Sequence, residues 1–246
     1  DVYKRQDFLY APKLTAPFLK DALSRWPAEQ GIGWPSWAFE NHDAPRAVSR
    51  WAGDIDAHAY CRMKMLLLAC LRGNIFLYYG EELGLPQVDI AFEDLQDPEA
   101  IANWPLTLSR DGARTPMPWT GAAPWLGFSD ARPWLPVGEA HRPLAVDVQE
   151  ADPVSLLHWT RAVLALRNAT PALRSGTITF LDTPDDLLAF ERTQDGQQRL
   201  CVFNLGTSPV AWRPADADRW QVELSTGRIA DWNFAPASGL VAAFQV

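Results

Sequence analysis

Cysteine and histidine are scarce in this sequence, which argues against several kinds of site. Its 246 residues include three cysteines, Cys61, Cys70 and Cys201, and four histidines. The number of cysteines is odd and their spacing suits no metal site, so we expect reduced thiols and no bound metal. Reduced thiols also favour a cytoplasmic location.

Positive charge and long apolar runs are also lacking. Lys and Arg total 22 against 30 Asp and Glu, so the formal net charge is -8. Nucleic-acid binding requires clustered Lys and Arg to contact phosphates, and no such cluster occurs, so we expect no nucleic-acid partner. The longest apolar run, at about residues 65–71, is too short to cross a bilayer, so we expect no membrane partner.

Apolar residues are plentiful. They make up 48% of the chain, and 12 of the residues are Trp. This composition allows a substantial core and argues against disorder. Trp rings stack on sugars, but buried aromatic rings dominate protein cores, so we expect most of these Trp side chains to serve in packing.

Helix-like and strand-like patterns alternate in the first part of the chain. Apolar spacing predicts a helix over residues 12–26 and a clearer one over Ala57–Leu71, with Gly73 as its C-cap. Continuous apolar runs at residues 36–39 and 74–79 predict buried strands of a parallel sheet. The order helix, strand, helix, strand predicts half of an α/β barrel or an open α/β sheet. In both architectures ligands bind at the carboxyl ends of the strands.

The rest of the chain divides at about residue 170. Residues 84–148 are rich in Pro and Trp without periodicity, which predicts a long functional loop, and Asp152-Pro153 predicts the start of another helix. We assign residues 1–170 to the α/β part and residues 171–246 to an all-β domain with a hairpin turn at Asp195-Gly196. Its predicted strands are Ile178–Leu181, Leu187–Arg192, Leu200–Phe203, Val210–Trp212, Trp220–Leu224 and Leu240–Phe244.

Polar residues that follow the two predicted buried strands are candidate functional groups. Asn41, His42 and Asp43 follow the first strand, although Asn and Asp are also common in loops, where they bond nearby backbone groups. Glu81 and Glu82 follow the second strand. Neighbours on a strand point to opposite faces, so these two carboxylates cannot act on one bond. We interpret them as salt-bridge or loop hydrogen-bonding residues.

Three stretches carry a resemblance to a known family. Residues 37–51, WAFENHDAPRAVSRW, resemble the fourth conserved segment of the α-amylase superfamily, and residues 73–86, GNIFLYYGEELGLP, resemble its eighth barrel strand. Residues 109–119, SRDGARTPMPW, followed by RPWLPV, resemble the α-glucosidase and oligo-1,6-glucosidase branch. The resemblance runs from about Phe8 to the C-terminus, and only Asp1–Gln6 match nothing in it.

The resemblance implies the C-terminal part of a (β/α)8 barrel followed by an antiparallel β-sandwich domain. It also implies a retaining glycoside hydrolase that removes terminal α-linked glucose from the non-reducing ends of oligosaccharides or other α-glucosides, without a cofactor. The family's nucleophile and acid/base carboxylates belong to segments outside this sequence. We therefore expect a fragment that is inactive alone.

Three site residues are implied by matching the family's motifs position by position. Asp43 matches the aspartate that stabilises the transition state, and His42 matches a neighbouring histidine that binds sugar hydroxyls. Arg110 matches an arginine that closes the non-reducing end of the pocket. A fixed carboxylate suits this role, because the oxocarbenium-like transition state is positively charged.

Some alternatives stay open. A glucosyl isomerase or transglucosidase would use the same site, whereas a non-catalytic barrel homologue would not need to retain Asp43 and Arg110. A sugar-binding β domain would expose aromatic platforms, but we expect the candidates to pack inside. These candidates are Trp212, Trp220 and Trp232.

Arginine side chains have a structural alternative as well. Arg110 has Asp111 and Glu82 as candidate ion-pair partners within its own loops. Arg46 and Arg50 also match common family positions. We interpret these two as members of structural ion pairs.

Overall fold

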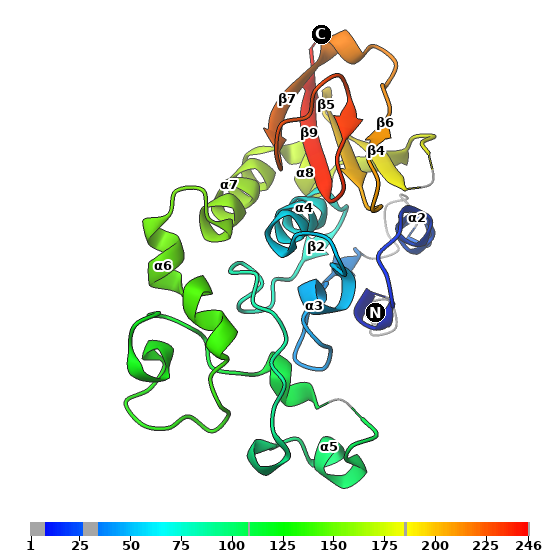
Figure 1. Ribbon diagram of the computed structural model, residues 1–246. Helices are drawn as coiled ribbons and strands as arrows, with labels where there is room; N and C mark the ends of the chain where they lie inside the picture. The colour runs from blue at the N-terminus through cyan, green and yellow to red at the C-terminus, as the bar shows by residue number, and fades with distance from the viewer. Residues whose placement is uncertain (1–7, 27–33, 108, 185, 246) are drawn as a thin grey trace. The chain divides into compact units, whose positions relative to one another are not determined.

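The protein forms two compact units that are interleaved along the sequence (Figure 1). The first unit runs to Ala38 and adds Asp54–Phe76 and Thr160–Val246; the second comprises Phe39–Gly53 and Leu77–Trp159. The computed structural model describes residues 8–26, 34–107, 109–184 and 186–245. Asp1–Gln6 lie outside the described residues.

A five-stranded antiparallel sheet with the order β3-β4-β5-β9-β7 dominates the first unit. The hairpin between β4 and β5 turns at Asp195 and Gly196, whose φ angles are 49° and 78°. Positive φ at both positions is typical of a two-residue hairpin turn, so the predicted turn is confirmed. The strands are β3 (Thr177–Phe180), β4 (Leu187–Gln194), β5 (Gln197–Asn204), β7 (Trp220–Ser225) and β9 (Ser238–Phe244).

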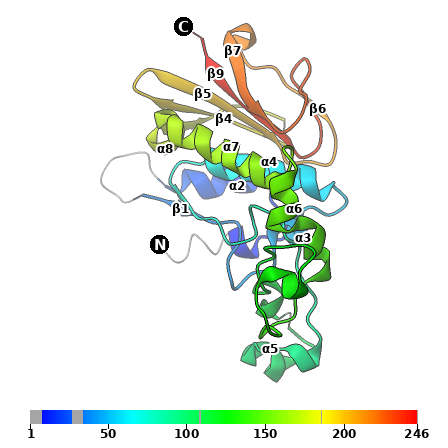
Figure 2. The same ribbon diagram turned by 90° about the vertical axis from the view of Figure 1, so that its left-hand side faces the viewer.

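Both faces of this sheet are covered. On one face, the short antiparallel pair β6 (Val210–Ala211) and β8 (Asn233–Phe234) contributes to a core cluster that includes Trp220 and Phe234. On the other face, α4 (Ala57–Cys70) and α8 (Pro171–Ser175) contact the central strands (Figures 1 and 2). The sequence patterns predicted the long strands, but they missed β8 and α8, which are too short to show a period.

Tryptophans of the β region pack largely as expected. Trp220 is 8% exposed within the core cluster. Trp212 and Trp232 are half-buried and pack against the same cluster. The Trp212 ring is also fixed at its edge, because its Nε1 donates to the Asp182 carbonyl oxygen at 3.2 Å.

The strands predicted in the first half are much shorter than expected. β1 (Ser36–Trp37) and β2 (Asn74–Ile75) pair in parallel, as their apolar runs predicted. The expectation that residues 74–79 form a buried strand is wrong: Phe76 and Leu77 are 46% and 36% exposed. Within the described part of the chain β2 has β1 as its single strand neighbour.

Helix α4 matches its prediction to within one residue. Asp56 caps it, with Oδ1 accepting from the Ala59 N–H at 2.8 Å. Gly73 is not its C-cap, because the helix ends at Cys70 and Leu71 is already extended. Gly73 is required for another reason: at φ +130° a Cβ there would lie 2.5 Å from the Pro35 carbonyl oxygen.

The predicted helix over residues 12–26 begins later than expected. It is α2 (Ala16–Ser24), and Thr15 caps it by accepting from the Phe18 N–H at 3.4 Å. Side chains such as Thr at this position satisfy an otherwise unpaired N–H, so they mark the true start of a helix better than the apolar pattern does.

Irregular backbone makes up most of the second unit, as predicted for residues 84–148. The helix predicted from Asp152-Pro153 begins instead at Leu156, where Ser155 Oγ accepts from the His158 N–H at 3.4 Å. This unit contains α3 (Ala47–Trp51), η1 (Phe92–Asp94), α5 (Pro98–Asn103), η2 (Arg110–Ala113), η3 (Pro124–Gly127), η4 (Glu139–Leu144), α6 (Val146–Ala151) and the start of α7 (Leu156–Ala169).

Polar side chains replace a strand ladder in this unit. Gln149 donates to the Leu83 carbonyl at 2.8 Å and accepts from the Leu157 N–H at 3.0 Å. Asp147 Oδ1 accepts from the Gly121 N–H at 2.8 Å. Buried backbone groups must be paired, and here side chains supply many of the partners that strands supply elsewhere.

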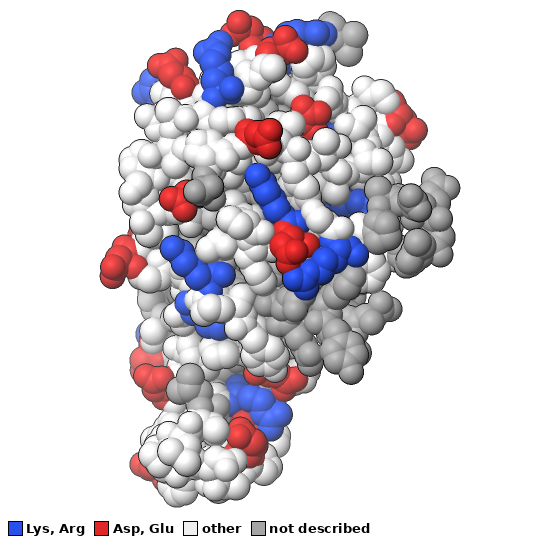
Figure 3. Space-filling model, turned by 90° about the vertical axis from the view of Figure 1, so that its right-hand side faces the viewer, with Lys and Arg blue, Asp and Glu red and all other residues white. Residues whose placement is uncertain are grey.

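Surface charge and apolar length complete the description. On the face drawn in Figure 3, acidic and basic side chains of the described residues are interspersed. In the described ranges, no helix combines the length and apolarity needed to cross a membrane.

Candidate active site

Asn41 organises the loop that presents the predicted site residues. Its Oδ1 accepts from the backbone N–H groups of Asp43 and Ala44 at 2.9 and 3.0 Å. This local turn is the capping role expected of Asn in a loop. The side chains of His42 and Asp43 remain 65% and 38% exposed, so both can meet a ligand.

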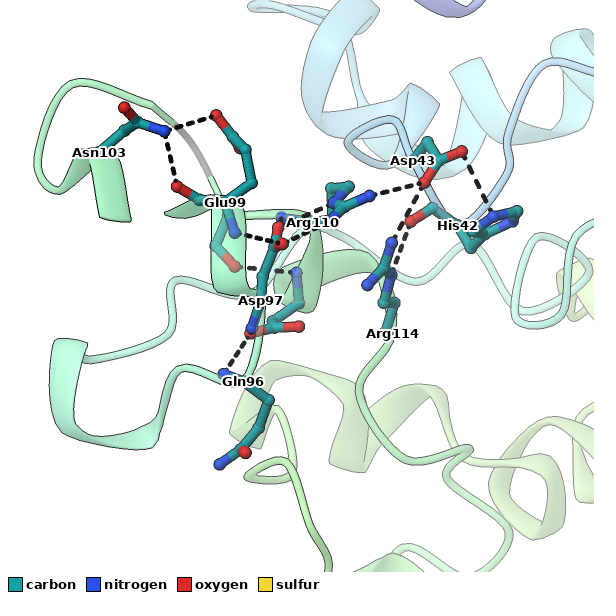
Figure 4. Close-up of polar contacts among 10 residues, drawn as sticks. His42, Asp43, Gln96, Asp97, Glu99, Asn103, Arg110 and Arg114 are labelled. Atoms are coloured by element: carbon teal, nitrogen blue, oxygen red, sulfur yellow. Dashed lines mark hydrogen bonds and ion pairs between the residues drawn. The ribbon is translucent and has the colours of Figure 1, made fainter. Parts of the chain in front are cut away.

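Asp43 is the centre of a small charged cluster (Figure 4). Its Oδ1 lies 3.1 Å from Arg114 Nη2 and 3.5 Å from Arg110 Nη1, and its Oδ2 lies 3.3 Å from His42 Nε2. The structure therefore brings together the three residues singled out in the sequence, Asp43, His42 and Arg110.

Arg114 belongs to this cluster although it was not predicted. Besides Asp43, it contacts the His42 backbone, because its Nε donates to the His42 carbonyl oxygen at 2.8 Å. The available signal was its place in the motif SRDGARTPMPW, four residues after Arg110. One arginine thus holds both the backbone and the carboxylate of the loop at His42-Asp43.

Arg110 has a different main partner from those expected. Neither Asp111 nor Glu82 pairs with it; Asp97 does, with Arg110 Nε to Oδ2 at 2.9 Å and Nη2 to Oδ1 at 2.5 Å. The hydrogen bonds from Arg110 hold the pKa of the Asp97 carboxyl well below its usual range. The same pairing raises the pKa of the Arg110 guanidinium. No sequence pattern pointed to Asp97, which lies thirteen residues before Arg110, with α5 between them.

Arg46 is a structural ion-pair residue, as predicted. Its Nη1 lies 3.2 Å from Glu40 Oε2, and both side chains are buried. Arg50 also acts structurally, donating to the Phe39 and Pro45 carbonyl oxygens at 2.6 and 2.8 Å. These contacts fix the backbone on both sides of the loop that carries Asp43.

Glu81 and Glu82 lie in a turn. The expectation that they are neighbours on a strand, with side chains on opposite faces, is therefore wrong. Glu81 is buried, and its Oε2 accepts from the Tyr78 N–H at 3.2 Å, which is the predicted loop hydrogen bond. Glu82 instead lines a cavity, and burial raises the pKa of its carboxyl. The turn, not strand alternation, sends these two side chains in different directions.

The cavity beside Glu82 has a volume of ≈ 550 Å³, which is within the range of small-molecule pockets. Of the charged cluster, Arg114 contributes to its wall. The remaining lining is largely apolar and aromatic. It consists of Tyr79, Glu82, Thr115, Pro116, Met117, Trp119, Phe128, Pro133, Trp134 and Leu135.

The cluster suits the binding of hydroxyl groups and of developing positive charge. Two guanidinium groups hold Oδ1 of Asp43, whereas its Oδ2 contacts His42 alone among the described residues. A carboxylate fixed in this way can accept hydrogen bonds without reorganising. In the described ranges, no three His, Cys, Asp or Glu side chains group as metal ligands would.

Comparison with known proteins gives consistent matches. Residues 4–176 match the family described as "Alpha amylase, catalytic domain", so the expectation that Asp1–Gln6 match nothing in the family is wrong for residues 4–6. The chain is 44% identical over 200 residues to a probable alpha-glucosidase of Rhizobium meliloti, covering 81% of this chain and 36% of that protein. It is 31% identical over 228 residues to an oligo-1,6-glucosidase of Heyndrickxia coagulans, covering 84% and 40%.

Solved structures agree with the sequence comparison. The alpha-glucosyl transfer enzyme XgtA superposes with a TM-score of 0.87 at 43% identity, covering 97% of this chain and 45% of that one. The trehalulose synthase MutB of Pseudomonas mesoacidophila superposes with a TM-score of 0.80 at 25% identity, covering 94% and 47%. The chain spans less than half the length of each of these relatives.

These matches account for the observed fold. Mixed helices and sheets, with parallel pairing of β1 and β2, are what a portion of a (β/α)8 barrel provides. The family match covers well over half of the chain and includes the loop of Asp43 and the segment of Arg110 and Arg114. The chain therefore belongs to the α-amylase family, and it carries part of that family's catalytic domain.

Proposed function

We propose that this chain is the C-terminal part of a retaining α-glucosidase, which removes terminal glucose from the non-reducing ends of α-linked oligosaccharides. The observation that carries the proposal is the half-exposed Asp43 carboxylate, held by Arg110 and Arg114 beside His42. The similarity to an alpha-glucosidase and an oligo-1,6-glucosidase supports the substrate class.

In this proposal Asp43 stabilises charge and does not form a bond. The transition state of glycoside cleavage is oxocarbenium-like, so a nearby fixed carboxylate lowers its free energy more than that of the substrate. His42 binds ring hydroxyls next to Asp43. Arg110 has Nη1 facing Asp43 and offers a forked donor for the terminal hydroxyls of the sugar.

The carboxylates that act as nucleophile and acid/base are proposed to lie in the part of the relatives that this chain does not span. The chain covers 36% of the probable alpha-glucosidase, which supports this division. The 246-residue chain alone should therefore release no nitrophenol from a nitrophenyl α-glucoside. The β-sandwich character of the predicted domain at residues 171–246 and a cytoplasmic location remain further parts of the proposal.

The test uses the complete protein that contains this chain. Asp43→Asn should lower kcat by about two to three powers of ten with a much smaller change in KM, because an amide keeps the shape but not the charge. Asp94→Asn is the matched control, since Asp94 pairs with Arg132 in an exposed ion pair. Turnover of the Asp43→Asn variant near that of the wild type would refute the assignment.

A second candidate is glucosyl transfer or isomerisation with the same residues. The observation that favours it is the superposition on an alpha-glucosyl transfer enzyme and a trehalulose synthase. Chromatography of the products formed from sucrose or maltose separates the candidates. Hydrolysis yields only free monosaccharides, namely glucose and fructose in equal amounts from sucrose and glucose alone from maltose, whereas transfer or isomerisation yields new disaccharides or longer sugars.

A further inference from the structure

Asp97 grips Arg110 in a forked arrangement. Its two carboxylate oxygens accept from Nε at 2.9 Å and from Nη2 at 2.5 Å. Charge-assisted, bidentate pairs of this kind are strong and fix the plane of the guanidinium. The remaining terminal nitrogen, Nη1, lies 3.5 Å from Oδ1 of Asp43, so Arg110 lies between the two carboxylates (Figure 4).

Backbone hydrogen bonds tie the two segments that carry this pair to each other. Asp97 Oδ2 also accepts from the Arg110 N–H at 3.1 Å. In return, Asp111 Oδ2 accepts from the backbone N–H groups of Gln96 and Asp97 at 2.7 and 2.8 Å. Each segment thus supplies a carboxylate to the backbone of the other. Asp97 further caps α5, accepting from the Glu99 N–H at 3.3 Å.

Asp97 and Arg110 differ in how far their side chains are exposed. The Asp97 side chain is 0% exposed, whereas the Arg110 side chain is 37% exposed. A sugar can therefore touch Arg110 but not Asp97. Arginine is long and flexible, so an unrestrained Arg110 would lose much rotamer freedom when it binds a ligand. Restraint by Asp97 removes that entropic cost before the sugar arrives.

We propose that Asp97 is a positioning residue, which sets the orientation in which Arg110 meets the non-reducing end of an α-glucoside. This inference rests on the proposed function for its substrate. Asp97 itself makes no contact with the sugar. Its effect on binding passes entirely through the guanidinium of Arg110.

The kinetic test is a double-mutant cycle in the complete protein. Asp97→Asn should raise KM for a nitrophenyl α-glucoside about tenfold or more, with kcat changed much less, because the amide cannot form the charge-assisted fork with Arg110. In an Arg110→Lys background, whose amine cannot form the fork, the same Asp97 change should have little further effect. Asp97→Glu, which keeps the charge, should recover part of the affinity.

Two controls make the outcome specific. Asp94→Asn removes an ion pair that is exposed at Arg132, and it should leave KM unchanged. An Asp97→Asn effect that is equally large with Lys at position 110 would show that Asp97 does not act through Arg110, and would overturn the inference. An inactive wild-type protein would instead refute the proposed function and leave the geometric claim to the next measurement.

A measurement on the complete wild-type protein needs neither a variant nor activity. With arginine labelled by 15N, the Arg110 Nε–H should exchange with water far more slowly than that of Arg132, whose side chain is 69% exposed. Rapid exchange at both positions would show that Asp97 does not restrain Arg110. That result would overturn the inference even if Asp97→Asn failed to fold.

Discussion

In the first unit, long strand ladders and apolar layers bury the backbone, whereas in the second unit individual polar side chains hold irregular segments together. The pair of β6 and β8 covers one face of the sheet, and α4 and α8 cover the other. The second unit relies on single groups such as Glu40, Asp97 and Gln149. A strand ladder spreads the stabilising contacts over many residues, whereas in the second unit a single carboxylate holds several groups at once. Point substitutions should therefore have different effects on the stability of the two units.

The partners of the arginines show the same contrast. In the first unit, Arg167 and Arg192 donate to carbonyl oxygens near the end of α4, including those of Ala69 and Cys70. In the second unit, Arg46 and Arg110 pair with carboxylates. The carbonyl groups do not titrate, but the carboxylates do. We therefore expect acid to weaken the second unit before the first.

The largest expected effect is in the second unit. Glu40→Gln removes the charge that faces Arg46 while both side chains are buried. Leaving a buried charge without its partner should cost about 3–5 kcal/mol of unfolding free energy. Hydrogen exchange followed by mass spectrometry should show faster exchange in Phe39–Gly53 and not in the sheet. An equal increase in both units would contradict the separation that we describe.

A somewhat smaller loss is expected from Arg192→Met in the first unit. This change leaves the Cys70, Gly176 and Thr177 carbonyl oxygens without the guanidinium that now donates to them. We expect a loss of about 3 kcal/mol, measured by urea unfolding, because each unsatisfied buried group costs about 1–3 kcal/mol.

The matched control for Arg192 is Arg199→Met. Arg199 pairs with Glu223 near the surface of the same sheet, so its loss should cost less than about 1 kcal/mol. Burial lowers the pKa of Arg192 to about 10, so that arginine stays charged at neutral pH. Equal losses of unfolding free energy from the two variants would show that the contacts of Arg192 with buried carbonyl groups stabilise the protein no more than a surface ion pair does.

Asp97 should make the second unit sensitive to acid. Its folded-state pKa is depressed, chiefly by hydrogen bonds from Arg110, so its contribution is present above the unfolded pKa of about 3.9. The contribution is lost as pH falls through the folded-state value. Asp97→Asn should remove this part of the acid dependence of unfolding. An unchanged pH profile between pH 5 and 2 would contradict it.

Glu82 should affect the pH dependence of stability in the opposite direction to Asp97, and its substitution should change stability the least. Burial in the cavity wall raises its pKa, so its contribution is present below the unfolded pKa of about 4.3 and is lost as pH rises through the folded-state value. Glu82→Gln should therefore stabilise the protein slightly at pH 7. Thermal melting at pH 7 and pH 4 tests this sign, and destabilisation at pH 7 would refute it.

Sequence patterns predicted the first unit well where elements are long. Helix α4 and strands β4, β5 and β9 all carry enough apolar residues to show a period, and the hairpin carries a specific turn signal. The exposure of residues 74–79 could not be predicted in the same way. An apolar run indicates that a segment could be buried, but only its neighbours decide whether it is covered.

The candidate site was predicted only in part, for a related reason. His42, Asp43 and Arg110 came from a family resemblance carried by contiguous motifs. Asp97 and Arg114 gain their roles from contacts across irregular backbone. No periodicity connects a loop carboxylate with an arginine thirteen residues later. Such partners become visible only in three dimensions.

The three cysteines have a practical consequence. Cys61, Cys70 and Cys201 are all buried thiols, and all belong to the first unit. Burial raises the pKa of the Cys201 thiol, which keeps it in its unreactive form. An alkylating reagent added in a brief pulse should therefore modify these thiols only in molecules whose first unit has opened. Alkylation therefore reports the opening of the first unit alone, because the second unit has no cysteine. The mass added at each cysteine measures how often the first unit opens.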